Sequence, residues 1–131
     1  MAIKSSLEPE EVKSSPAIEL LTTEFKANKK KVRISAFYRP PNLIDEDYLE
    51  TVKQEFQKIS KRNKNTVCII AGDFNLPDID WKSLAVTGHQ YPSRVNKTFL
   101  EVIANNNLEQ IVDFPTRKDN TLDLVLTTHP S

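Results

Sequence analysis

Glycine and cysteine are scarce in this sequence of 131 residues, and each shortage excludes a class of site. Two glycines are too few for the glycine-rich phosphate loops of the Walker or dinucleotide-binding type. A single cysteine, Cys68, excludes an internal disulfide framework and a cysteine-rich zinc site. No run approaches the roughly 18 consecutive apolar residues that a membrane span needs, and the N-terminus lacks the apolar segment of a secretory signal. We therefore expect no membrane partner and an intracellular location, the nucleus included.

A net excess of one charge is also missing, since 18 Lys and Arg balance 18 Asp and Glu. The charges are unevenly spread: residues 1–64 carry 13 basic and 10 acidic side chains, and residues 65–131 carry 5 and 8. A polyanion such as nucleic acid would have to bind local patches, of which residues 29–33 and 58–64 are candidates. A solvated loop is the alternative interpretation of each patch.

The hydrophobic pattern predicts one mixed α/β domain over residues 1–131, of which residues 1–16 are weakly structured. Two β-rich runs, 17–25 and 31–38, predict a hairpin with a longer loop. Residues 66–71 form a continuous β-branched run, which favours a central strand covered on both faces. Residues 72–81 read as a loop, and two further strands are expected at 109–114 and 121–127. Strands that are adjacent in sequence favour a mixed sheet over a parallel one.

Two helices are expected on the same criteria. Asp45 is a suitable N-cap for a helix through residue 60, whose apolar residues recur at spacings of three and four. A second helix is expected from an N-cap at Ser93 to about Asn105. The asparagines at 105–107 can supply a left-handed C-cap.

Asp73 and Asn75 give the strongest chemical signal. They follow the apolar strand directly and stand two residues apart, so in extended backbone they would face the same side. A carboxylate there could orient a water or bind Mg²⁺ through oxygen, and the amide could donate to a developing phosphate oxyanion. An Asx turn, in which the pair only shapes the backbone, is the alternative.

The sequence around these residues resembles the endonuclease/exonuclease/phosphatase superfamily, and more narrowly the apurinic-type endonuclease domain of non-LTR retrotransposons. Three segments carry the resemblance in the family's order: Phe-Tyr-Arg-Pro-Pro-Asn at 37–42, Gly-Asp-Phe-Asn-Leu-Pro-Asp-Ile-Asp-Trp at 72–81 and Phe-Pro-Thr-Arg-Lys-Asp-Asn-Thr-Leu-Asp-Leu-Val-Leu at 114–126. The resemblance implies a partial two-sheet α/β sandwich of the DNase I-like type. It also implies Mg²⁺ or Mn²⁺ as cofactor and DNA as the partner of the parent domain, which in these elements accompanies a reverse transcriptase.

The resemblance also implies roles for individual residues. Asp73 would orient the attacking water, with metal binding as a further option, and Asn75 would hold the scissile phosphate. Tyr38 would place its phenol against the phosphate or its leaving group, and Asp123 would hold a catalytic histidine in its tautomer. Arg39 and Arg117 would contact backbone phosphates. The alternatives are a strand-capping Tyr38, an Asp123 paired with Arg117 or a turn amide, and two surface arginines.

Two parts of the family pattern are not found in this sequence: the metal-binding glutamate with its asparagine, and the late Ser-Asp-His segment. His129 follows the Asp123 strand too closely to be the family histidine. We therefore expect a single incomplete domain that is inactive or a poor nuclease by itself, because interdependent catalytic groups fail together. Open sheet edges would favour self-association. The rival functions are a non-catalytic binding or dimerisation remnant and a phosphatase-type member of the same superfamily.

Overall fold

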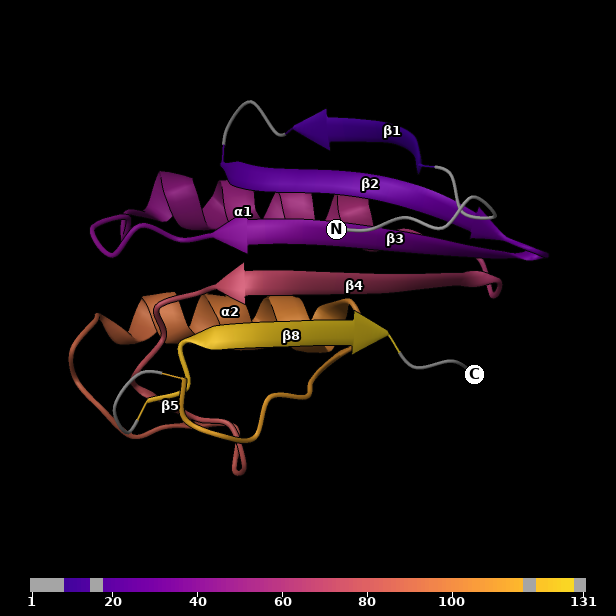
Figure 1. Cartoon of the computed structure of the whole chain (residues 1–131). Helices are drawn as coiled ribbons and strands as arrows, with labels where there is room; N and C mark the ends of the chain where they lie inside the picture. The colour runs from indigo at the N-terminus through magenta and orange to yellow at the C-terminus, as the bar shows by residue number, and fades with distance from the viewer. Residues whose placement is uncertain (1–8, 15–17, 117–119, 129–131) are drawn as a thin grey trace.

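One six-stranded mixed sheet organises the chain (Figure 1). The computed structural model describes residues 9–14 as backbone, and residues 18–116 and 120–128. The strand order is β1-β2-β3-β4-β8-β7. These strands are β1 (Pro9–Ser14), β2 (Glu19–Ala27), β3 (Lys30–Tyr38), β4 (Thr66–Asp73), β8 (Asp123–Thr128) and β7 (Leu108–Gln110). Among the strands of the described residues, β3 and β4 pair in parallel, and every other neighbouring pair in this sheet is antiparallel.

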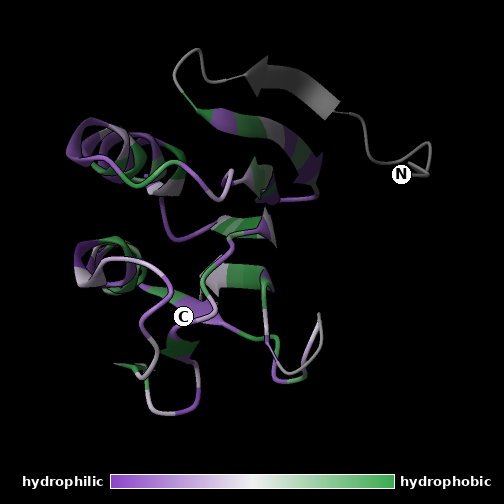
Figure 2. Ribbon diagram, turned by 90° about the vertical axis from the view of Figure 1, so that its left-hand side faces the viewer, coloured by the Kyte–Doolittle hydropathy of each residue, from purple (hydrophilic) through white to green (hydrophobic). Residues whose placement is uncertain are grey.

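Both helices cover the same face of this sheet, α1 (Glu46–Ser60) and α2 (Ser93–Asn105) (Figures 1 and 2). Their apolar sides turn toward the strands, as the green ribbon in Figure 2 shows. Four phenylalanine rings form the centre of the core in edge-on and tilted contacts: Phe37, Phe56, Phe74 and Phe99. Such ring pairs stabilise a core beyond their buried area.

The opposite face of the sheet carries no helix or strand in the described part of the chain. Alternate residues of β4 that point there, Val67, Ile69 and Ala71, are only partly buried. Leu21 of β2, on the same face, is 50% exposed. The prediction that this strand is covered on both faces is therefore wrong for the described residues, although its central place in the sheet is confirmed.

The helix ends follow the sequence in one case and depart from it in the other. Asp45 caps α1 as predicted, its carboxylate accepting the Tyr48 N–H at 3.3 Å. Ser93 is not an N-cap: α2 begins at that residue, and Pro92 precedes it without a side-chain cap. Asn107 adopts φ 55°, so the left-handed turn expected after α2 is confirmed.

The loops are tighter than expected. β2 and β3 extend until Ala27 pairs with Lys30, which leaves a two-residue turn in which Asn28 has φ 59°. The predicted loop at 72–81 contains the end of β4 and the two-residue strand β5 (Ile79–Asp80), which pairs with β6 (Ala85–Val86). The strand expected at 109–114 is confirmed only as the short β7.

Candidate functional site

Three polar side chains meet at one end of the sheet, on the face that the helices leave open. Tyr38 ends β3, Asp73 ends β4 and Asp123 begins β8. Tyr38 is the register partner of Asp73, and Asp73 is the register partner of Asp123. Residues paired in this way project to the same side with their Cβ atoms about 5 Å apart. The sheet therefore presents a phenol and two carboxylates in a row.

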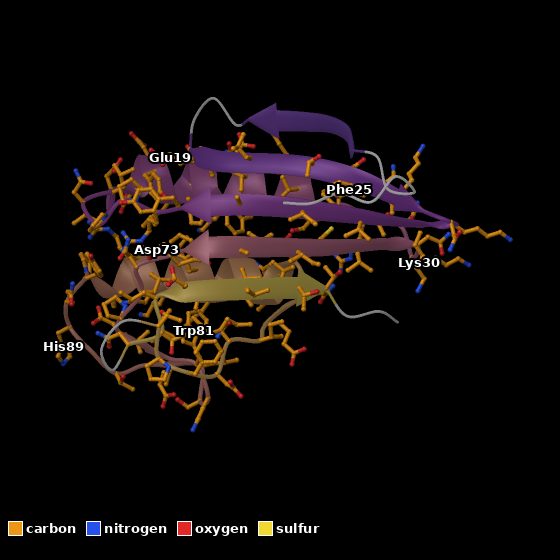
Figure 3. The ribbon with its side chains drawn as sticks, viewed as in Figure 1. Glu19, Phe25, Lys30, Asp73, Trp81 and His89 are labelled. Carbon is orange, nitrogen blue, oxygen red and sulfur yellow. The ribbon has the colours of Figure 1, made fainter. Side chains whose placement is uncertain are left out.

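These side chains are accessible to a ligand. Tyr38 is 40% exposed and Asp123 is exposed. Figure 3 shows Asp73 at this end of β4 and Glu19 at the same end of β2, with β3 between them. Two carboxylates placed directly opposite each other on neighbouring strands repel, and a cation between them would relieve that repulsion.

The backbone turns sharply after Asp73. One carboxylate oxygen of Asp73 accepts the N–H of Asn75 at 3.1 Å, so the Asx turn weighed in the sequence is present. Asn75 has φ 51°, which breaks the extended backbone on which the same-side argument rested. The Nδ2 of Asn75 donates to the carbonyl of Arg39 at 2.8 Å. An amide has two N–H donors, and this bond uses one of them.

Gly72 allows this turn to lie against β3. A Cβ at that position would lie 1.7 Å from the carbonyl oxygen of Phe37. No side chain fits there, because Cβ atoms in proteins do not approach a backbone oxygen below about 3 Å. The close approach holds Asp73 level with Tyr38.

Arg39 is fully buried and fixes the turn from beneath. Its Nε donates to the carbonyl of Phe74 at 2.8 Å and its Nη2 to the carbonyl of Asn75, while Nη1 donates to Leu43 at 3.1 Å. The prediction that Arg39 contacts substrate phosphates is wrong, because its guanidinium has no exposed surface and is already bound to backbone carbonyls. It is a positioning residue.

Asp78 is a second buried polar group next to this turn, and the sequence pattern does not predict its burial. It is 3% exposed, and its carboxylate accepts the N–H groups of Gln90 and Tyr91 at 2.9 and 2.8 Å. The loop held in this way places the Tyr91 ring 4.6 Å from the Arg39 guanidinium carbon. This cation–π contact supports the same turn.

Gly88 is the one feature of the sequence that could have indicated the close contact between this loop and Asp78. A Cβ at Gly88 would lie 2.4 Å from a carboxylate oxygen of Asp78. In a sequence with two glycines, each one marks a close approach beside this site.

A metal ion would find two carboxylates here. Mg²⁺ prefers oxygen ligands and often binds through one or two carboxylates, several waters and substrate phosphates. Asp73 and Asp123 fit that pattern. Among the described residues, no group of three His, Cys, Asp or Glu is arranged to hold a metal. Arg117 and His129 lie outside the described residues.

A family model described as endonuclease-reverse transcriptase matches residues 32–131. The chain belongs to the endonuclease-reverse transcriptase family. The match includes all of the segments that carry Tyr38, Asp73, Asn75 and Asp123. No curated protein is similar enough in sequence to match the chain.

Solved structures agree with this family at the level of fold. The endonuclease domain of TRAS1, a telomere-specific non-LTR retrotransposon, is similar with a TM-score of 0.60 at 18% identity, covering 95% of this chain and 57% of that one. A D. rerio TDP2 humanized by 14 mutations has a TM-score of 0.56 at 13% identity, over 95% and 53%. D. rerio TDP2 complexed with a single-strand DNA product gives 0.52 at 13%, over 95% and 54%.

These likenesses confirm the expected fold class, a partial DNase I-like α/β sandwich with a mixed sheet and two helices. The chain spans little more than half the length of these solved structures. Within the described residues, neither helix is long and apolar enough to cross a membrane.

Proposed function

We propose that this chain supplies part of the active site of a metal-dependent phosphodiester hydrolase that nicks DNA, as in the endonuclease of a non-LTR retrotransposon. One observation carries the proposal: Tyr38, Asp73 and Asp123 are register neighbours on three adjacent strands, on one accessible face. The family match supports the reaction class.

Each residue has a role in this proposal. Asp73 orients the attacking water and, with Asp123, binds Mg²⁺ or Mn²⁺ weakly in the presence of substrate phosphate. Asn75 donates its remaining amide N–H to the phosphate oxygen on which charge develops. The Tyr38 phenol donates to the phosphate or to the leaving oxygen. The buried Arg39 keeps the turn in place.

The proposal includes weak or absent hydrolysis by the chain alone. Phosphodiester cleavage needs a firmly held cation, an oriented water and a proton donor or further cation opposite. Within the described residues, Asp73 and Asp123 are carboxylates on directly paired strands, and no group of three His, Cys, Asp or Glu is arranged to hold a metal. The same observation favours the rival function, a non-catalytic nucleic-acid-binding remnant.

Nicking of supercoiled plasmid with Mg²⁺ tests the proposal, with Asp73→Ala as the comparison and Asp80→Ala as the control. Asp80 is exposed and lies on β5 outside the row of register neighbours. We expect little nicking by the chain and a loss of whatever nicking occurs in Asp73→Ala but not in Asp80→Ala. Nicking that persists in Asp73→Ala would contradict the role of Asp73.

Self-association through the sheet edges, β1 and β7, remains a prediction for the isolated chain. Sedimentation of the purified chain over a range of concentrations would test it. The phosphatase-type alternative has no separate support in the arrangement of these residues.

A further inference from the structure

The end of the sheet opposite the site gathers two basic loops that are distant in sequence. One is the turn between β2 and β3 at Asn28 and Lys29, and the other is the connection at 61–65 between α1 and β4. The N–H of Lys31 donates to the carbonyl of Asn65 at 2.9 Å, so the two loops lie side by side. Figure 3 shows Lys30 at this end, far from Asp73. We define the basic end by four exposed lysines: Lys29, Lys30, Lys61 and Lys64.

Other cations near these lysines already have a structural role. Arg33 pairs with Glu24 at 2.7 Å and donates to the carbonyl of Ile59 at 2.8 Å, which satisfies the C-terminus of α1. Lys31 also contacts Glu24, at 3.6 Å. Arg62 donates to the carbonyls of Ser60 and Asn106. These groups hold the loops together.

The four lysines of the basic end have no such role. In the part of the chain that the structure describes, none of them has a carboxylate within ion-pair distance. The dipole of α1 favours a cation at its C-terminus, and this accounts for Lys61 next to Ser60. It does not account for Lys29 and Lys30, which lie in and beside a hairpin turn. Unpaired like charges held close together repel, so the fold gains nothing from them.

We propose that the basic end binds the phosphodiester backbone of nucleic acid as a surface separate from the Asp73 site. The two loops consist of Asn-Lys-Lys-Lys at 28–31 and Lys-Arg-Asn-Lys-Asn at 61–65, which are side chains typical of phosphate and sugar contacts. They contain no aromatic or aliphatic anchor of the kind that membrane surfaces need. Protein interfaces are depleted of lysine in their core, which disfavours a protein partner.

The two surfaces do not overlap. Lys31 and Tyr38 are seven residues apart on β3, which at roughly 3.3 Å per residue separates the ends by about 23 Å. A backbone bound at the basic end leaves Tyr38, Asp73 and Asp123 free. The inference rests on the charge distribution and holds whether or not the chain hydrolyses phosphodiesters.

Fluorescence anisotropy with a labelled duplex DNA, and with a single-stranded RNA of equal length, tests the inference. The variant Lys29→Glu/Lys64→Glu changes one lysine from each loop. We expect at least tenfold weaker binding of duplex DNA. We also expect a salt dependence of log K that is less steep by about 1.8, because each lost phosphate contact removes roughly 0.9 from the slope.

The charge-matched control is Lys82→Glu/Lys97→Glu, which changes two exposed lysines outside the basic end, one between β5 and β6 and one on α2. We expect less than a twofold change in the control, and thermal unfolding should show both variants to be folded. Equal weakening in both variants, or no weakening in the first, would overturn the inference. Competition by poly-glutamate as effective as that by DNA would also overturn it, in favour of an acidic polypeptide partner.

The two nucleic acids distinguish the source of the phosphate. If the variant loses affinity for DNA and for RNA equally, the basic end binds the phosphate backbone without discriminating between them. If it loses affinity for one nucleic acid alone, that one is the ligand. The experiment measures binding and not hydrolysis, so a failed hydrolase proposal would leave this result unchanged.

Discussion

The two ends of the sheet are built from the same strands and yet have opposite charge and different construction. At the Asp73 end, β3 and β4 end and α1 begins. The carboxylates at this end are Glu19, Asp45, Glu46, Asp47, Asp73 and Asp123. At the basic end, both helices terminate, and lysines gather instead. The dipole of α1 favours this division, with Glu46 and Asp47 in its first turn and Lys58 in its last. Helix α2 does not contribute, because it has no acidic residue in its first turn and no basic residue in its last. The dipole does not explain Tyr38, Asp73 and Asp123, which lie on the face away from the helices.

The difference between the ends lies in what is buried beneath them. Under the Asp73 end, Arg39 and Asp78 are buried and hydrogen-bonded to backbone groups of two loops. Their exposed neighbours, Tyr38 and Asp123, are therefore displayed on a fixed backbone. Catalysis requires reacting groups that are held in a fixed geometry. Electrostatic attraction of a phosphate backbone does not, so flexible lysines are sufficient for it.

The largest expected effect is on Arg39. Arg39→Ala leaves several buried carbonyls without donors, each costing about 1–3 kcal/mol, so we expect the free energy of unfolding to fall by about 3–5 kcal/mol. Urea denaturation measures it. The exposed Arg94→Ala on α2 is the control, with a change below about 0.5 kcal/mol. Equal effects of the two substitutions would contradict the role assigned to Arg39.

A smaller effect is expected in the loop held by Asp78. Gly88→Ala should lower the free energy of unfolding by about 1–3 kcal/mol, because its Cβ would collide with the Asp78 carboxylate. In an Asp78→Ala background the same substitution should cost less, since the colliding atoms are gone. A double-mutant cycle measures this coupling, and strictly additive effects would show that the contact does not limit position 88.

One carboxylate, that of Glu24, stabilises the loops of the basic end through its ion pairs with Arg33 and Lys31. Burial raises the pKa of Glu24, but the hydrogen bond and charge of Arg33, together with Lys31, outweigh it and hold the pKa below its ordinary value of 4.5. A lowered pKa means that the stabilisation is complete above pH 4.5 and is lost as the pH falls through the folded-state value.

In Glu24→Gln we therefore expect a lower free energy of unfolding at pH 7, by about 1 kcal/mol or less. The difference in the free energy of unfolding between Glu24→Gln and the unmodified chain should shrink as the pH falls below 4.5, as measured by urea denaturation. A gap that stays constant with pH would show that the Glu24 carboxylate is not the stabilising group.

The smallest effect on stability is expected for the exposed site residues. Tyr38→Phe and Asp123→Asn remove a phenol and a charge that the described structure does not use, so the free energy of unfolding should change by less than about 0.5 kcal/mol. Thermal unfolding measures it. Losses above about 2 kcal/mol would make these residues structural and would weaken the proposed site.

The sequence predicts the parts of the fold whose causes are local. Helix α1 is predictable because Asp45 caps it and its apolar spacing is regular. The Asp73 motif is predictable because it follows an apolar strand. The buried place of Arg39 is not, because its partners are the carbonyls of Phe74 and Asn75, 35 and 36 residues further along the chain. A charged side chain is ordinarily expected at the surface. Its burial can be predicted only when the backbone carbonyls that accept its hydrogen bonds are known.

Ser93 and Asn75 illustrate two further limits. Serine is a favoured N-cap, but the fixed backbone of Pro92 starts α2 one residue earlier than the serine could. The same-side rule for residues two apart holds only in extended backbone, and Asn75 leaves that conformation. The rule therefore did not hold for this pair. The placement of Asp73 between Tyr38 and Asp123 follows instead from the register of three strands.

Paramagnetic broadening by Mn²⁺ tests the central claim most directly, that Tyr38, Asp73 and Asp123 form one phosphate- and cation-binding pocket. In amide NMR spectra of the isotope-labelled chain, titrated with Mn²⁺ in the presence of a short oligonucleotide, we predict selective loss of the signals of these three residues. Asp73→Asn should prevent that loss, and Asp80→Asn should not. Broadening spread over all exposed carboxylates, or confined to residues away from Asp73, would contradict the claim.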